Sequence, residues 1–186
     1  MFLIQKPSEA DVQAFLARAR ESGLTYTSIG ATEGNAPDGY VIDHNRIDLG
    51  RDWEAAKQAV CQWRMFDFDW VEVFPNTPPI ETGETVGVLI RHLGFYSLNA
   101  ARIVYTIDEP DRFGFAYGTL EDHAESGEER FLVERDADGV VQYDLKAFSR
   151  PNHTLAVLGY PLVRTLQKQF GQESKRAMFR AVNSIG

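Results

Sequence analysis

The 186-residue sequence has one cysteine, no long apolar run and no excess of basic residues. A single cysteine, Cys61, cannot form a disulfide within the chain, which fits a reducing compartment. No stretch approaches the roughly 20 consecutive apolar residues that a membrane-spanning helix needs, so we expect no stable membrane insertion. The formal net charge of -8 argues against a general nucleic-acid binder, because phosphate contacts require a basic surface.

The first residues, MFLIQKPSEADV, hold a four-residue apolar run and then become charged. A secretory signal requires a longer apolar core, so we expect a cytoplasmic protein. Cys61 falls within a helical pattern beside Val60 and Trp63, which favours a buried and inert thiol.

A chain of this length supports one domain with a substantial core, and no repeat or linker divides it. We therefore predict a single domain over residues 1–186. Ser8 and Asp11 are spaced to cap a helix that ends near Gly23, and this helix, within residues 1–24, is a candidate local addition.

Apolar residues alternate with a period of two through the middle of the chain, which is typical of strands. Short, turn-rich connectors between them indicate antiparallel neighbours. The predicted strands are 40–50, 70–74, 85–93, 99–108, 112–119, 128–135 and 140–149.

From Asn152 onward a helical period returns, in a stripe that narrows from Leu and Phe to Ser174, Ala177 and Ala181. About seven antiparallel strands and one long C-terminal helix bury their apolar faces together only if the sheet curls around the helix. The sequence thus predicts an α+β helix-grip fold. The small residues on the final helix are compatible with space beneath it and equally with close packing.

Strand alternation assigns several polar and aromatic side chains to the concave face of this sheet. An apolar surface with a few orienting polar groups is typical of a pocket for a small, largely apolar or amphipathic molecule, although a solid core fits the pattern too. The candidate ligand-binding residues are Tyr105, Phe115, Tyr117, Glu129, Tyr143 and His92.

Residues 121–138 hold eight acids and two arginines, a net charge of -6, and we read them as an acidic hairpin. Within it, Glu125 and Glu128 are expected to accept backbone N–H groups and to pair with nearby arginines. Glu129 shares its face with Phe131 and Val133, where an unpaired carboxylate is costly, so it needs a partner, a proton or a ligand.

Two other functions stay open for this region. Glu129 with His123 or His92 forms a possible acid/base pair for a cyclase- or hydratase-like enzyme. The acidic hairpin 121–138 is alternatively a docking surface for a basic protein partner. One histidine among scattered carboxylates lacks a recognised ligand spacing, so we expect no metal, and no motif calls for a cofactor.

Three segments carry a family resemblance: YTSIGATEGNAPDGY, LNAARIVYTIDEPDRFGFAYGTLEDHAESGEERFLVE and AFSRPNHTLAVLGYPLVRTLQKQF. Together they resemble the family named domain of unknown function nineteen-ninety, known from bacteria and plants. That family is grouped with the START and birch-pollen-allergen-like (Bet v 1-like) helix-grip proteins. The resemblance implies the same fold, and a cavity between sheet and final helix in which many such proteins bind lipids, sterols or polyketides.

Overall fold

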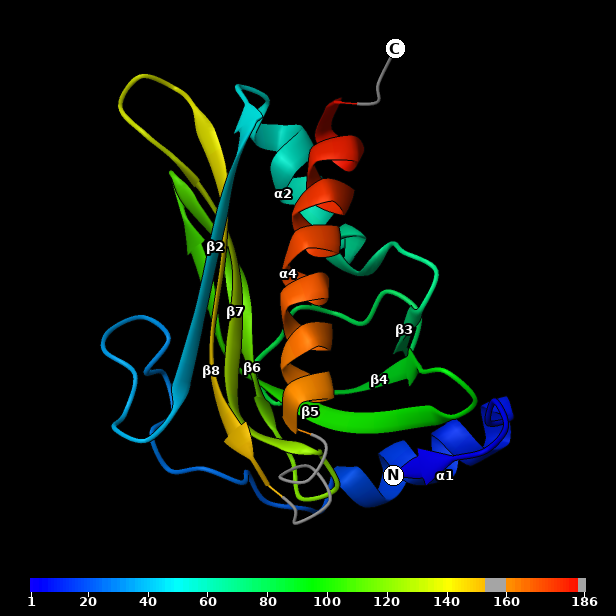
Figure 1. The fold of residues 1–186 in the computed structure, drawn as a ribbon. Coiled ribbons are helices and arrows are strands. Elements are labelled where there is room, and N and C mark those ends of the chain that lie inside the picture. The colour runs from blue at the N-terminus through cyan, green and yellow to red at the C-terminus, as the bar shows by residue number, and fades with distance from the viewer. Residues whose placement is uncertain (153–159, 184–186) are drawn as a thin grey trace.

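The computed structural model describes residues 1–152 and 160–183, which form a curved antiparallel sheet and helices on both of its faces (Figure 1). The elements in chain order are β1 (Phe2–Leu3), α1 (Glu9–Ala19), β2 (Val41–Gly50), α2 (Trp53–Cys61), the 3-10 turn η1 (Arg64–Phe66), β3 (Val71–Phe74), β4 (Thr85–Arg91), β5 (Tyr96–Glu109), β6 (Arg112–Thr119), β7 (Glu125–Arg135), β8 (Val141–Pro151) and α4 (Tyr160–Asn183).

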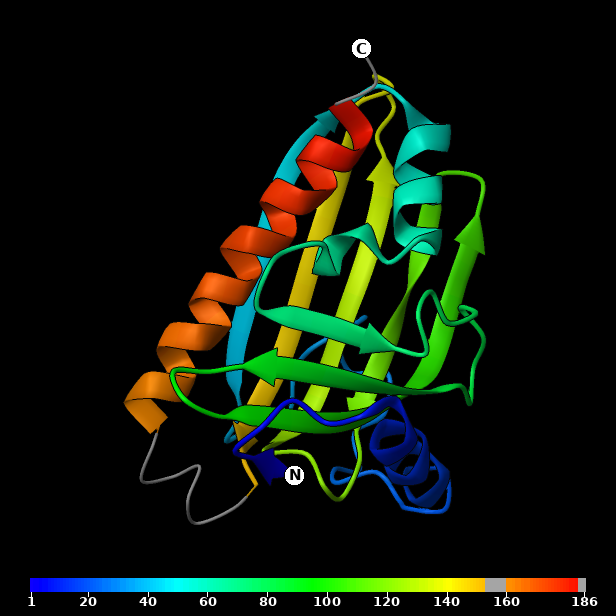
Figure 2. The same cartoon turned by 90° about the vertical axis from the view of Figure 1, so that its right-hand side faces the viewer.

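The main path of the sheet runs β2-β8-β7-β6-β5-β4-β3, and the short β1 pairs with β5. All of these pairs are antiparallel. Curvature turns β3 and β4 across the direction of β7 and β8, and α4 lies along the concave side (Figure 2). The predicted α+β helix-grip class is confirmed.

Local sequence explains where the first two helices begin. The Ser8 side chain accepts from the backbone N–H of Asp11, whose carboxylate accepts the Ser8 N–H in return, which completes a capping box for α1. Asp52 caps α2 by accepting from the Ala55 N–H at 3.0 Å.

The prediction that Cys61 is buried is wrong, because Cys61 is the last residue of α2 and its side chain is exposed.

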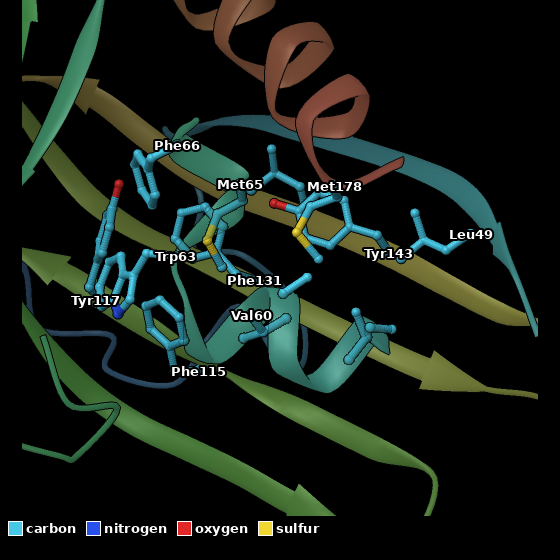
Figure 3. Close-up of a cluster of buried hydrophobic side chains, with 14 of the residues drawn as sticks. Leu49, Val60, Trp63, Met65, Phe66, Phe115, Tyr117, Phe131, Tyr143 and Met178 are labelled. Atoms are coloured by element: carbon cyan, nitrogen blue, oxygen red, sulfur yellow. The ribbon is translucent and has the colours of Figure 1, made fainter. Parts of the chain in front are cut away.

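The main core fills the space between the concave face and the elements α2, η1 and the C-terminal half of α4 (Figure 3). In it Phe115 packs between Trp63 and Phe131, with ring centroids 4.6 and 5.2 Å away. The Tyr143 hydroxyl lies 2.8 Å from Ser174 Oγ on α4. Side chains therefore fill the space between the sheet and the C-terminal half of α4, and we call this region the solid core.

The helix α4 is described from Tyr160, and the predicted start near Asn152 falls partly on residues outside the described ones. Its small residues mark close packing: a Cβ on Gly171 would approach Asn45 Nδ2 to 2.8 Å, and Ser174 and Ala177 are buried. Of the two interpretations of the small stripe, tight contact with the sheet is therefore the correct one.

The convex face of the sheet is covered by α1 and by the loop after it. Tyr26 from this loop lies over Gly118, where an added Cβ would come within 2.2 Å of the Tyr26 hydroxyl. The absence of a side chain at Gly118 therefore lets this loop pass close to the strand.

Candidate functional site: an acid-lined cavity under the last helix

A cavity of about 310 Å³ lies between the N-terminal half of α4 and the concave face. Val163, Leu166 and Phe170 contribute from α4, while strands β2 to β8 supply the facing wall. It adjoins the solid core, which begins around Phe131. The volume lies at the lower end of the range for small-molecule sites, and the lining is mostly apolar.

Glu129 is on the inner face of β7 and lines the cavity, as its strand phase predicted. Its Oε2 accepts a hydrogen bond of 2.7 Å from the Tyr117 hydroxyl. Burial raises the pKa of Glu129 to about 7, although the hydrogen bond from Tyr117 acts in the opposite direction. The pair can therefore hold or release a proton near neutral pH.

Glu125 departs from its prediction, because it is only 8% exposed and lines the same cavity. β7 begins at Glu125, opposite Pro151 at the end of β8, so the ladder carries this residue inward. Gln167 Nε2 donates to its Oε2 at 3.3 Å, while Oε1 has no hydrogen-bond partner among the described residues. Burial raises the pKa of the Glu125 carboxyl.

Both histidines proposed as acid/base partners line the cavity. His92, just after β4, places Nε2 at 2.8 Å from Ser97 Oγ and stacks on Phe95, and burial lowers its pKa. His123, in the loop before β7, accepts the Glu125 backbone N–H on Nδ1 at 3.0 Å. The structure thus brings His92, His123, Tyr117 and Glu129 to one cavity.

Three of the candidate ligand-binding residues lie elsewhere. Phe115 and Tyr143 face inward but belong to the solid core and do not line the cavity (Figure 3). Tyr105 lies on the opposite side of the sheet, where its hydroxyl is 2.7 Å from Thr32 Oγ1. Their assignment as cavity contacts is wrong.

A β-bulge accounts for the error at Tyr105. The register of β5 against β6 shifts between Ile103, which pairs with Tyr117, and Tyr105, which pairs with Ala116. One extra residue in a strand reverses the face of every residue after it. Alternation read straight through β5 therefore placed Tyr105 on the wrong side.

The reading of residues 121–138 as an acidic hairpin is also wrong. Residues 125–135 form β7, a central strand, so the exposed acids at its two ends lie at opposite ends of the sheet. Of the acids between them, Glu125 and Glu128 are buried. The segment therefore does not offer one continuous acidic surface to a partner.

Glu128 is structural, as expected, although not through arginines. On the convex face its carboxylate accepts from Tyr26 Oη at 2.8 Å, from the Gly30 N–H at 2.8 Å and from the Thr32 N–H at 3.0 Å. Thr32 Oγ1 donates as well. The arginines pair elsewhere, Arg130 with Asp144 and Arg135 with Asp111.

Sequence reasoning missed several polar residues of the cavity. Asp43 and Asn45 reach it from β2, and Gln167 reaches it from α4. Arg164 clamps Asp43 with two hydrogen bonds of 2.5 and 2.8 Å. The alternation of β2 held this signal, since Asp43 and Asn45 pair with the inward-facing Ala147 and Leu145.

The charges around the cavity are unbalanced. Asp43, Glu125, Glu128 and Glu129 line it, although the Glu128 carboxylate bonds to Tyr26, Gly30 and Thr32. No lysine or arginine lines it within residues 1–152 and 160–183. The Trp70 indole N–H, on the same lining, has no acceptor among the described residues. Over those residues no three His, Cys, Asp or Glu side chains gather closely enough to hold a metal ion.

Comparison with known proteins begins with a family model, "Domain of unknown function (DUF1990)", which matches residues 25–177. A UPF0548 protein of Deinococcus radiodurans is 40% identical over 196 residues, covering 97% of this chain and 98% of that protein. A UPF0548 protein of Dictyostelium discoideum is 38% identical over 209 residues, covering 99% and 97%. The relatives thus include a eukaryotic protein as well as a bacterial one.

Solved structures resemble the chain in fold at low identity. Human STARD10 has a TM-score of 0.51 at 12% identity, covering 98% of this chain and 82% of that one. Norcoclaurine synthase from Thalictrum flavum has a TM-score of 0.51 at 10% identity, covering 88% and 96%. None of the helices described here is long and apolar enough to cross a membrane. With its START/Bet v 1-like helix-grip fold, the chain belongs to the DUF1990 family, whose curated relatives carry the name UPF0548.

Proposed function

We propose that the protein binds one small, largely apolar molecule in the cavity between α4 and the sheet. The observation that carries this proposal is that side chains fill only part of the space between α4 and the sheet. Around Tyr143 and Phe115 this space is a packed core, and around Glu129 it is a cavity. Protein atoms do not fill this volume of about 310 Å³, so a ligand of matching size gains packing contacts with its lining on binding.

Polar groups on the cavity lining would orient a bound ligand. Glu129 has one described donor, Glu125 has an oxygen with none among the described residues, and His92 and Gln167 add further polar atoms. Of the residues first assigned from the sequence, Tyr117, Glu129 and His92 are in place to contact a ligand, and that role stays a prediction. A cytoplasmic location stays a prediction too.

The test is to fill the cavity from within. Ala147 lines it, and Ala147→Leu adds three carbon atoms to the lining, whereas Ala10→Leu adds the same volume on the exposed face of α1. Native mass spectrometry and solvent extraction of the purified protein should detect a small molecule with the parent chain and Ala10→Leu, and much less of it with Ala147→Leu. Equal retention by both variants, or no retained molecule at all, would argue against the proposal.

A second function, proton-transfer catalysis, is favoured by one observation. The Glu129 carboxyl, with a pKa of about 7, lies in hydrogen-bond contact with Tyr117 in the cavity, and a general acid or base works best near such a value. Glu129→Gln keeps the size of the side chain and removes the proton carrier. If the cavity is catalytic, this variant should retain a substrate that differs in mass from the molecule retained by the parent; an identical molecule in both supports binding alone.

A further inference from the structure

The titratable and charged groups around the cavity come from β2, α4 and β7, from the segment after β4 and from the loop before β7. β2 brings Asp43, which is paired with Arg164 of α4. β7 brings Glu125 and Glu129, and the segments next to β4 and β7 bring His92 and His123. Glu128 is also on the lining, but its carboxylate bonds to the loop on the convex face. With Glu128 and the Asp43–Arg164 pair set aside, two carboxyl groups face the cavity without a described lysine or arginine on its lining.

Glu125 shows that this region has unused capacity to accept hydrogen bonds. It is more than nine-tenths buried, it lines the cavity, and its Oε1 has no described donor. A buried polar atom without a partner destabilises the protein, so such atoms usually have a water or a ligand beside them. On the same inner face of the strand, Glu129 has one described donor, the Tyr117 hydroxyl.

We propose that the ligand is an apolar amine, whose protonated head group binds Glu129 while Glu125, further along the same strand, adds to the negative charge of the cavity. This inference rests on the proposed function and specifies its ligand class. An ammonium group carries one positive charge and three N–H donors, which the Glu129 carboxylate can accept. A hydroxyl offers a single donor and no charge.

A carboxylate ligand, such as a fatty acid, is disfavoured by the same residues. It would bring a negative charge next to Glu125 and Glu129 with no described cation on the lining to receive it. Arg164 of α4 donates to both oxygens of Asp43. The raised pKa of Glu129 agrees with this description, because burial raises it first, the charge of Asp43 adds to the rise, and only the Tyr117 hydrogen bond lowers it.

Three probes with the same apolar tail test the head group: octylamine, octanol and octanoate. Titration calorimetry at about pH 8 leaves the amine protonated and most of Glu129 ionised. Octylamine should bind at least about tenfold more tightly than octanol, and octanoate should bind most weakly. Octanol or octanoate binding as tightly as octylamine would overturn the amine inference and leave the proposed function standing. Failure of all three to bind would overturn both.

Single substitutions test which residues cause the preference for octylamine. Glu129→Gln should lower octylamine affinity about tenfold, to the level of octanol, and leave octanol binding unchanged. Glu125→Gln should weaken octylamine binding by a smaller factor. Glu134→Gln is the matched control, since Glu134 is on the same strand, pairs with Arg46 and does not line the cavity. An unchanged octylamine preference in both folded cavity variants would contradict the inference.

Discussion

Glu128 and Glu129 are consecutive residues of β7, yet they face opposite sides of the sheet and differ in almost every physical respect. On the convex side Glu128 accepts hydrogen bonds from Tyr26, Gly30 and Thr32, so its acceptor capacity is used within the protein. On the concave side Glu129 accepts one described hydrogen bond, from Tyr117, and lines the cavity.

Glu128 therefore stabilises the fold, whereas Glu129 is available to a ligand. Charge-assisted hydrogen bonds compensate the desolvation of Glu128, and they fix the loop that carries Tyr26 across Gly118. Glu129 keeps part of its desolvation cost, which appears as the raised pKa. Buried carboxyl groups with strongly raised pKa values cluster at functional sites, and Glu129 has this property.

The largest effect is expected at the convex face. Glu128→Gln replaces one acceptor oxygen by an NH₂ group that faces N–H and O–H donors, so it should lower the free energy of unfolding by about 3 kcal/mol or more. Urea denaturation followed by circular dichroism measures this loss. Glu134→Gln, at a partly exposed position of the same strand, should change stability by well under about 1 kcal/mol. A Glu128→Gln protein as stable as this control would contradict the structural role.

The concave face should respond in the opposite direction. Because the pKa of Glu129 is raised to about 7 from its ordinary 4.5, the folded state holds the proton more tightly, and stability falls as pH rises between these values. Glu129→Gln removes that loss, so the variant should exceed the parent by on the order of 2 kcal/mol at about pH 8 and match it near pH 5.

The measurement is urea denaturation of parent and variant at both pH values. Combined with the ligand titrations, it gives Glu129→Gln a distinctive outcome: a more stable protein that binds octylamine less well. A variant that is less stable at about pH 8 would mean that Glu129 carries compensating interactions in the folded state. In that case the contrast with Glu128 would not hold.

Much of the architecture was predictable because it depends on periodicity alone. The period of two through residues 70–149 predicted antiparallel strands, and the apolar stripe of the last helix predicted the element that they curl around. The inward direction of Glu129 followed from its phase with Phe131 and Val133. β7 was predicted to start at Glu128, three residues late, because Glu125 and Ser126 look like loop residues and their pairing with β8 is a tertiary effect.

The cavity itself was less predictable, since it depends on where packing is incomplete. The sequence does not distinguish Tyr143, which is held by Ser174 in the solid core, from Tyr117, which lines the hollow. It also gave no sign that the loop from Tyr26 to Thr32 returns to cover the convex face, because that contact joins residues about a hundred positions apart in the chain.

The smallest expected effect concerns Tyr105 and Tyr117, which strand alternation assigned to the same face of the sheet. The bulge in β5 places Tyr105 on the convex face, whereas Tyr117 lines the cavity on the concave face. Tyr105→Phe removes a hydrogen bond to Thr32 on the convex face and should cost about 1 kcal/mol without changing octylamine affinity. Tyr117→Phe removes the described donor to Glu129, so a carboxyl that is already raised to a pKa of about 7 should titrate at still higher pH, and octylamine binding should shift upward in pH with it. Calorimetric titrations of both variants between about pH 6 and pH 9 compare the two positions directly. A shift in the Tyr105→Phe profile as large as that of Tyr117→Phe would mean that both tyrosines reach the cavity and that β5 continues without the bulge.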